Sequence, residues 1–354
     1  MNTKDFIIEK LSQADESPIS GEELALQCGV SRAAIWKAIN SLRQEGYEIS
    51  GTTNGGYQLS SSGDILTHKT LSRFFTSTFP QFAQSHIECF KEIDSTVSYA
   101  ERCISSAGAL RDANGELTEA GKSFHNSIIV AETQTAGRGR SGRSFVSPLK
   151  TGIYLTVIYA PKGGITNPAK ITAFSAVAVC RALKTLYGIE PSIKWINDIF
   201  YNGKKVCGIL TTGSTNFETG IIESAIIGIG INIEENPAAF GKELSKTAGG
   251  IFSGEGKKIP RAQLAAKVAG NVLTVLSEPE SAVIEEYKNL SFIIGREVEV
   301  HSLIDSSAGI YTAKVVDIDK NLALVVELDD GTRRSLISGE VSLKSDFFTA
   351  RNEL

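Results

Sequence analysis

The segment Gly137–Gly142 constrains the fold more than any other feature of this chain, because its three glycines have the spacing G-x-G-x-x-G between two apolar runs. In a dinucleotide-binding turn this spacing follows a strand and opens a helix. Here it follows the strand-like run Ser127–Glu132, but Pro148 and a second strand-like run, Ile153–Tyr159, come next. The segment is therefore predicted to be a loop between two strands, and a nicotinamide-type site is not expected.

The same loop carries three arginines, Arg138, Arg140 and Arg143. Glycine lets a backbone approach a ligand closely, and guanidinium groups bind phosphate or carboxylate. The loop therefore indicates an anion site. The alternative interpretation is a flexible basic surface loop, against which its place between two apolar strands argues.

Further along, two apolar runs flank Asn202-Gly203, which predicts a hairpin. Lys205 begins the second of these strands, and alternation points it away from Val206. Such a lysine is either solvated or functional. Ile226–Ile233 is an apolar strand with two glycines, which suits a ligand or a backbone packed close to it. A helix is expected after Asn167-Pro168 and covers the sheet.

The first 60 residues carry the signals of three helices and a hairpin. Ser20 and Glu23 form a capping-box sequence before a helix over Gly21–Cys28, and Ser31 caps the next helix. Two alternating runs follow, with a turn expected at 54–56. Helix, turn, helix and wing is the plan of a winged helix-turn-helix domain.

Charge gives a mixed answer about nucleic acid. The first 60 residues carry five Lys/Arg and eight Asp/Glu, a net charge of −3, and the whole chain has −4. The second helix of the motif nevertheless carries Arg32, Lys37 and Arg43 without an acid, which suits contact with phosphates. The alternative is a winged domain that binds protein.

Three domains are expected. Residues 1–62 form the winged domain, and small polar residues at 60–64 suggest a linker. Residues 66–290 mix strands and helices. In residues 291–354, short strands are expected at Glu297–His301, Gly309–Ile318, Ala323–Leu328 and Arg333–Ile337, with a turn at 329–331, which suits a small SH3-like barrel. Residues 108–125 look like an inserted surface loop.

Several classes of protein are not expected. The five cysteines are odd in number and show no C-x-x-C spacing, so neither disulfides nor a zinc site is predicted. A reducing cytoplasm is the predicted location. No metal-ligand pattern involves the four histidines. Neither a signal peptide nor an apolar run long enough to span a membrane is visible.

Motifs in all three blocks resemble those of the bifunctional biotin protein ligases that also act as biotin operon repressors. ETQTAGRGRSGRSF looks like their glycine–arginine loop, and KWINDIFYNGKKVCGIL resembles K-W-P-N-D … K-x-x-G-I-L. GIGIN resembles a G-x-G-x-N strand, Asp94-Ser95-Thr96 resembles D-S-T-N, and Gly339–Lys344 is similar to the C-terminal barrel. The likeness covers nearly the whole chain in order.

The resemblance implies an α+β chain with a winged helix-turn-helix domain, a mixed-sheet ligase domain and a C-terminal SH3-like barrel. It also implies the functional residues. Those expected at biotin and ATP are Ser95, Thr96, Gln134, Gly137, Arg138, Gly139, Arg140, Asn197, Asp198, Lys205, Gly208 and Asn232. Lys205, Arg140 and Arg143 are expected to be catalytic. Those expected at DNA are Ser31, Arg32, Ala33, Trp36, Lys37 and Asn40.

The implied chemistry is carboxylate activation. Biotin and ATP, with Mg²⁺, would give biotinyl-5′-adenylate, and a lysine of a biotin carboxyl carrier protein would then receive the biotin. The adenylate-bound chain would form a homodimer on palindromic operator DNA. Biotin's carboxylate is already ionised, so no general base is needed and cations carry the catalysis.

Three residues depart from the family pattern, and three other functions stay open. Val97 replaces Asn, Ile196 replaces Pro, and Phe145 stands where Trp is common. The chain could be a regulator that binds biotin without catalysis, a ligase whose winged domain does not repress, or a lipoate-attaching enzyme. The arginines and Lys205 argue against the first, the acidic first block keeps the second open, and the winged domain argues against the third.

Overall fold

The computed structural model describes residues 3–14, 17–44, 47, 49–52, 55–59, 66–112, 114–216, 220–252, 260–301, 310–337 and 340–343. The chain forms two compact units, one of residues 1–66 with 257–262 and the other of the remainder. The central and C-terminal sheets thus share one unit, and the three domain boundaries given above remain predictions. Within the described ranges, no helix has the length and apolar character needed to cross a membrane.

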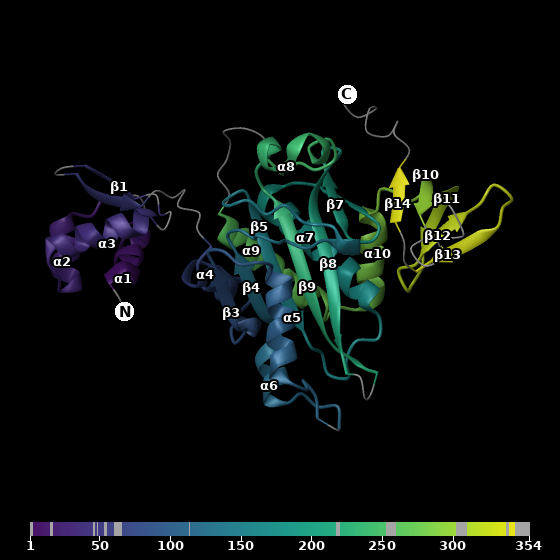
Figure 1. Ribbon diagram of the computed structural model, residues 1–354, viewed down its shortest axis with the longest axis horizontal. Helices are drawn as coiled ribbons and strands as arrows, with labels where there is room; N and C mark the ends of the chain where they lie inside the picture. The colour runs from purple at the N-terminus through teal and green to yellow at the C-terminus, as the bar shows by residue number, and fades with distance from the viewer. Residues whose placement is uncertain are drawn as a thin grey trace. The chain divides into compact units, whose positions relative to one another are not determined.

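The N-terminal unit confirms the predicted order of helices and wing (Figure 1). Its elements are α1 Thr3–Gln13, α2 Gly21–Cys28, α3 Arg32–Gln44, β1 Ile49–Thr52 and β2 Gly56–Leu59, with the two strands antiparallel. Ser20 Oγ accepts from Glu23 N, and Ser31 Oγ accepts from Ala34 N, so both predicted caps form. The Glu23 carboxylate accepts from Gln27 rather than closing a capping box. Residue 54 of the predicted turn and the linker at 60–64 lie outside the described residues.

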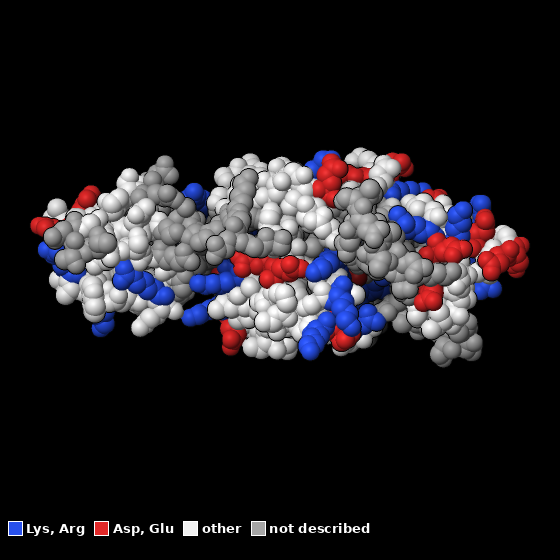
Figure 2. Space-filling model, turned by 90° about the horizontal axis from the view of Figure 1, so that it is seen from above, with Lys and Arg blue, Asp and Glu red and all other residues white. Residues whose placement is uncertain are grey.

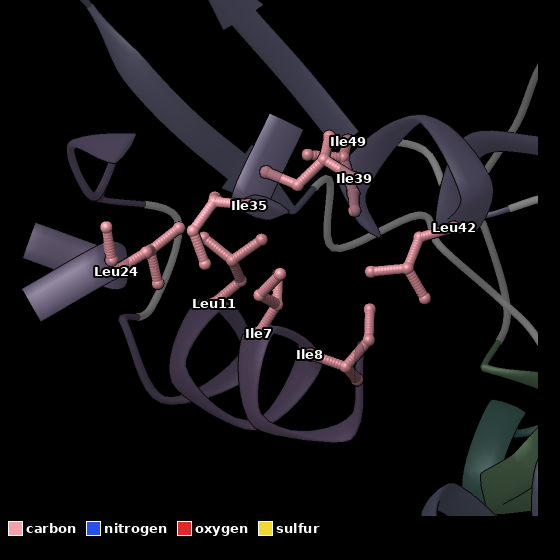
Figure 3. Packing of buried hydrophobic residues seen from close by; sticks show 9 residues of the cluster. Ile7, Ile8, Leu11, Leu24, Ile35, Ile39, Leu42 and Ile49 are labelled. Atoms are coloured by element: carbon pink, nitrogen blue, oxygen red, sulfur yellow. The ribbon is translucent and has the colours of Figure 1, made fainter. Parts of the chain in front are cut away.

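This unit has its own hydrophobic core. Figure 3 shows the side chains of Ile7, Leu11 and Ile35 meeting between α1 and α3. Leu24 of α2 and Ile49 of β1 complete the packing. Because these residues recur at helical spacing in α1 and α3, burying them fixes which face of α3 remains in solvent.

A seven-stranded mixed sheet forms the centre of the second unit. Its order is β3-β4-β5-β9-β8-β7-β6, and β3 and β4 are parallel while all other pairs are antiparallel. The strands are β3 Ile87–Phe90, β4 Ser127–Ala131, β5 Gly152–Tyr159, β6 Ser192–Lys194, β7 Asp198–Tyr201, β8 Lys204–Thr215 and β9 Ile222–Asn232. The predicted loop and hairpin are confirmed, since β4 and β5 flank the glycine–arginine segment and β7 and β8 flank Asn202-Gly203.

The second unit also contains seven helices among its described residues, two of which, α5 and α7, cover opposite faces of the sheet. The seven are α4 His68–Thr78, α5 Thr96–Ala107, α6 Glu119–Phe124, α7 Pro168–Tyr187, α8 Pro237–Leu244, α9 Arg261–Val275 and α10 Glu280–Leu290, with short 3₁₀ turns at Pro80–Phe82 and Arg140–Gly142. Leu210 of β8 packs against the α5 cluster, whereas the next residue, Thr211, accepts a hydrogen bond at its Oγ1 from Thr172 Oγ1 of α7 at 2.8 Å. Consecutive strand residues face opposite sides, so α5 and α7 lie on opposite faces.

The inserted segment 108–125 is not simply the surface loop that was expected. It contains α6, and its Leu110 is fully buried against α5. Arg111 is buried too, donating to the carbonyl oxygens of Gly115 and Pro161. Apolar burial and backbone pairing thus anchor the segment, which composition alone did not indicate.

The C-terminal sheet is the small antiparallel one that was predicted. Its order is β13-β12-β11-β10-β14, so the last strand lies beside the first. The strands are β10 Glu297–His301, β11 Ile310–Ile318, β12 Leu324–Glu327, β13 Arg333–Leu336 and β14 Glu340–Leu343, and the turn at 329–331 joins β12 to β13. Gly339 and Lys344 lie outside the described residues. The indole of Trp195, which precedes β7, donates to Leu322 O at 2.8 Å and ties this sheet to the central one.

Candidate active site and DNA-contact surface

A cavity of about 460 Å³ opens on the α5 face of the central sheet. It gathers nearly all of the residues that the sequence indicated for biotin and ATP, although they come from segments more than 100 residues apart. Those lining it are Ser95, Thr96, Gln134, Arg138, Gly139, Arg140, Arg143, Asn197, Asp198, Lys205, Gly208 and Asn232. Gly137 is not part of the lining. It supports the loop from behind, since a Cβ there would meet Phe145 O at 2.3 Å.

One end of the cavity carries uncharged hydrogen-bonding groups. Gln134 Oε1 accepts from Thr96 N at 2.9 Å and from Thr96 Oγ1 at 3.2 Å, and Gln134 Nε2 donates to Ser147 Oγ at 2.8 Å. Thr156 Oγ1 of β5 donates to Thr96 Oγ1 at 2.8 Å. Thr96 begins α5, and Ser95 caps that helix. Gln134 is half-buried and its partners are buried, and these groups hold one another in place before any ligand arrives.

The middle of the cavity is apolar and close to the backbone. A Cβ on Gly228 would lie 2.4 Å from Val97, and one on Gly230 would lie 2.5 Å from the Phe145 ring. The two glycines of β9 therefore let these side chains rest directly on the sheet. Val97 is buried in the α5 core, so the valine that departs from the family pattern packs as an apolar residue.

The other end is charged. Lys205 Nζ lies 2.6 Å from Asp198 Oδ1, and Asn197 Nδ2 donates to the same oxygen at 2.8 Å. Arg140 donates to Asn197 Oδ1 at 2.6 Å. Arg140 of the loop and Lys205 of β8 are thus linked to each other. The link passes through the Asn197 amide, between β6 and β7, and the Asp198 carboxylate on β7.

A β-bulge aims Lys205 into this end. Lys205 pairs with Phe200 and Cys207 pairs with Ile199, so Val206 is an extra residue on β8. With strict alternation Lys205 would face away from Gly208, but the bulge turns it to the same side, with Nζ 3.3 Å from where a Gly208 Cβ would be. The sequence placed Lys205 on a strand but missed this bulge.

Across the sheet, the lining changes character in strand order. The uncharged end lies at β5, the glycines at β9, Gly208 at β8 and Asp198 at β7. Three strand spacings separate the ends, roughly 14 Å. The cavity therefore suits an elongated ligand with a neutral polar head, an apolar chain and an anionic end.

The glycine–arginine loop closes on itself over the charged end. Gly139 N donates to Arg143 O at 2.7 Å, Arg143 N donates to Arg140 O at 3.1 Å, and Ser141 takes a φ of 54° at the tip. Arg140 and Arg143 line the cavity, as expected. The Arg138 side chain instead reaches α5, where it donates to Glu101. Its contact with biotin remains a prediction.

Other lining residues were missed by the sequence analysis. The cavity is also lined by Phe240 and Leu244 of α8, by Thr247 and Ala248 after it, and by Val341 of β14. Val341 lies in the segment Gly339–Lys344 that resembles the family's barrel, but nothing marked it as a cavity residue, because an apolar side chain near a ligand looks the same as a core residue. Cys207 also lines it, and burial raises the pKa of its thiol well above the usual value, so it is no thiolate nucleophile.

The predicted DNA-contact residues lie on one exposed face of the N-terminal unit. Ser31, Arg32, Ala33, Trp36 and Lys37 are exposed, and Asn40 is half-buried. Arg43, the third basic residue of this helix, is exposed as well, and it braces β1 against α3: its Nε donates to Ile49 O at 2.8 Å and its Nη1 to Asn40 Oδ1 at 3.4 Å. Where Figure 2 shows described surface, basic and acidic side chains are interspersed without one broad basic band, in keeping with the net charge.

Three family models match consecutive parts of the chain. The HTH domain matches residues 3–58, the biotin/lipoate A/B protein ligase family matches 119–232, and the biotin protein ligase C terminal domain matches 293–344. The bifunctional ligase/repressor BirA of Bacillus subtilis is 30% identical over 95% of this chain and 97% of its own length. The chain belongs to the bifunctional biotin ligase/repressor family.

Other members of the biotin ligase group agree with this assignment. The bifunctional ligase/repressor BirA of Escherichia coli is 28% identical over 92% of this chain and 93% of its own length. The solved structure of the biotin protein ligase from Aquifex aeolicus in complex with biotin and ATP is 25% identical, with a TM-score of 0.56 over 73% of this chain and 97% of that one. Family membership thus spans all three predicted parts of the chain.

Proposed function

We propose that this chain is a biotin protein ligase and a biotin-responsive repressor. The ligase would activate biotin with ATP and transfer it to a lysine of a biotin carboxyl carrier protein. The observation that carries the proposal is the order of chemistry across the cavity. Biotin's neutral ureido ring fits the Thr96–Gln134 end, its apolar chain fits the apolar middle that Val97 and Phe145 form on β9, and its carboxylate then meets the cations with the ATP phosphates.

In the first step, an oxygen of the biotin carboxylate forms a bond to the α-phosphorus of ATP. The bond from that phosphorus to the bridging oxygen breaks, and pyrophosphate leaves. The carboxylate is already ionised, so no base is required. Lys205, Arg140 and Arg143 are proposed to stabilise the charge that grows on the phosphoryl oxygens and leaving group.

Mg²⁺ is part of the proposal, and the residues present fit it. Asp198 is the one carboxylate among the described residues that line the cavity, and Asn197 precedes it in the chain and adds an amide oxygen to the same lining. Mg²⁺ prefers oxygen ligands and commonly uses one or two carboxylates with substrate phosphates. Asp198 and Asn197 would hold the ion, which when bound neutralises phosphate charge.

In the second step, the lysine amine of the acceptor attacks the acyl carbon of the mixed anhydride. The new C–N bond forms, the acyl–phosphate bond breaks and AMP leaves, while the amine loses its proton. The nucleophile comes from the acceptor. The buried, high-pKa Cys207 thiol is consistent with this, since the chain needs no covalent intermediate of its own.

Repression is proposed to use the same adenylate. Two copies of the chain, dimeric when adenylate-bound, would present two α3 helices to the half-sites of a palindromic operator. The exposed face of Arg32, Trp36 and Lys37 supports contact with a groove. A cytoplasmic location is also proposed, supported by five cysteines that are all free.

The test is a mass measurement on an acceptor. The full chain is incubated with biotin, ATP, Mg²⁺ and a biotin carboxyl carrier domain, and the acceptor is weighed by mass spectrometry. We expect one biotinyl group to be added, and none when ATP is omitted. An acceptor that gains nothing, while the chain still binds biotin, would refute the ligase and leave a non-catalytic regulator.

A further inference from the structure

Helix α5 contacts the glycine–arginine loop through Glu101, a residue outside the predicted site. Arg138 Nη1 donates to Glu101 Oε2 and, at 3.3 Å, to Ser98 Oγ. The other carboxylate oxygen, Glu101 Oε1, accepts from Thr212 Oγ1 of β8 at 3.0 Å. Glu101 therefore ties the loop to the sheet and not only to its own helix.

The neighbouring residue, Arg102, fixes the base of the same loop. It forms two hydrogen bonds with the Asp94 carboxylate, at 2.6 and 2.9 Å, and Asp94 O accepts from Ala136 N at 2.8 Å. Hydrogen bonding to Arg102 lowers the pKa of Asp94 to about 2, so this pair is charged at neutral pH. Two consecutive residues of α5 thus hold the loop two residues apart, at 136 and 138.

The position of Arg138 sets the position of the loop tip. Arg138 pairs with Ser144 in an isolated bridge, and the next residue, Gly139, donates to Arg143 O. Arg140 and Arg143 therefore lie on a short closed turn whose two stems are joined at Arg138. Any shift of Arg138 along α5 moves both cavity-facing arginines with it.

The Glu101 pair is suited to positioning more than to global stability. The side chains of Arg138 and Glu101 are 42% and 34% exposed, and such pairs add little to the free energy of unfolding. Thr212 holds Glu101 from β8, so less side-chain entropy is lost when Arg138 binds it. The pair can therefore place the loop without being essential to the fold.

We propose that Glu101 is a positioning residue that clasps Arg138 and thereby keeps Arg140 and Arg143 over the charged end of the cavity. This inference rests on the proposed ligase function for its consequence: the clasp keeps the adenylate in the cavity until an acceptor arrives. Loss of the clasp increases escape of the adenylate and weakens biotin binding. It leaves acyl transfer from bound adenylate nearly unchanged, because Lys205 stays on β8.

Two readouts on the full chain test the clasp, using Glu101→Gln, Thr212→Val and the control Glu119→Gln. Glu119 pairs with Lys122 on α6 and is exposed, so its variant removes the same charge from a pair outside the cavity. Trypsin cleavage after Arg140 and Arg143, without ligands, reports loop order. The dissociation rate of biotinyl-adenylate, the KM for biotin and the single-turnover transfer rate report function.

We expect Glu101→Gln to increase the rate of trypsin cleavage and the rate of adenylate dissociation about fivefold, as for the loss of one charged pair. The KM for biotin should rise by about the same factor. Thr212→Val should give a smaller change of the same kind, with transfer rates within about twofold and Glu119→Gln like wild type. Equal trypsin cleavage in Glu101→Gln and Glu119→Gln would overturn the clasp. Because trypsin needs no ligand, that result is distinct from a wild-type chain that makes no adenylate, which would refute the ligase alone.

Discussion

The cavity and the α3 surface both gather basic side chains, but they hold them in different ways. In the cavity, Lys205 is held at 2.6 Å by Asp198, and Arg140 at 2.6 Å by Asn197. On α3, Lys37 is exposed, and Arg32 comes no closer than 3.9 Å to Glu22 in a pair whose side chains are both largely exposed. Fixed cations suit a transition state of defined geometry, whereas solvated cations suit a phosphate backbone whose contacts are exchangeable.

This difference predicts how strongly the removal of each cation reduces the reaction rate or the affinity for DNA. A fixed cation acts at one point of the reaction, so its loss should cost orders of magnitude in rate. A solvated cation contributes one of several phosphate contacts, so its loss should cost a small factor that depends on salt. Three substitutions test this contrast, from the largest expected effect to the smallest.

Lys205→Ala should reduce the rate of adenylate formation by about 10²–10³-fold, the usual cost of removing one group that stabilises a developing charge. The measurement is pyrophosphate release under saturating biotin and ATP. Lys204→Ala is the matched control, because the adjacent lysine pairs with Glu235 at 2.6 Å and does not line the cavity. Equal losses in the two variants would contradict the role given to the fixed cation.

Much of the fold that carries Lys205 was open to prediction from local signals. Asn202 and Gly203 have φ values of 48° and 76°, as the Asn-Gly turn requires. Asn167 caps α7 by accepting from Ala169 N at 3.0 Å. Such features depend on a few neighbouring residues, so the sequence alone indicates them.

The direction in which the functional side chains point could not be predicted from local signals in the same way. The bulge at Val206, which turns Lys205 into the cavity, arises from the pairing of β8 with β7. The bond from Arg138 to Glu101 joins residues 37 positions apart, and the bond from Arg43 to Ile49 O joins α3 to β1. Each depends on which strand or helix becomes a neighbour, and local propensity does not contain that information.

Lys37→Ala should weaken operator binding about three- to tenfold and reduce the slope of log K against log salt by about 1, as for one phosphate contact. The measurement is an operator titration at several salt concentrations with biotin and ATP present. Lys10→Ala on α1 serves as control, since Lys10 lies over the Phe6 ring and is not among the proposed DNA contacts. An unchanged slope in Lys37→Ala would mean that this lysine does not meet phosphate.

Arg43→Ala gives the smallest expected effect. It also tests the contrast most directly, because Arg43 is a basic residue of α3 whose guanidinium is held by a hydrogen bond, as the cations of the cavity are. Its loss leaves the buried Ile49 carbonyl without that donor, so the local opening free energy of β1 and β2 should fall by about 1–2 kcal/mol. Amide hydrogen exchange of the full chain measures this opening. The salt slope of operator binding should match wild type, since the guanidinium is used within the unit. A slope lower by about 1, with exchange unchanged, would instead return Arg43 to the group of solvated phosphate contacts.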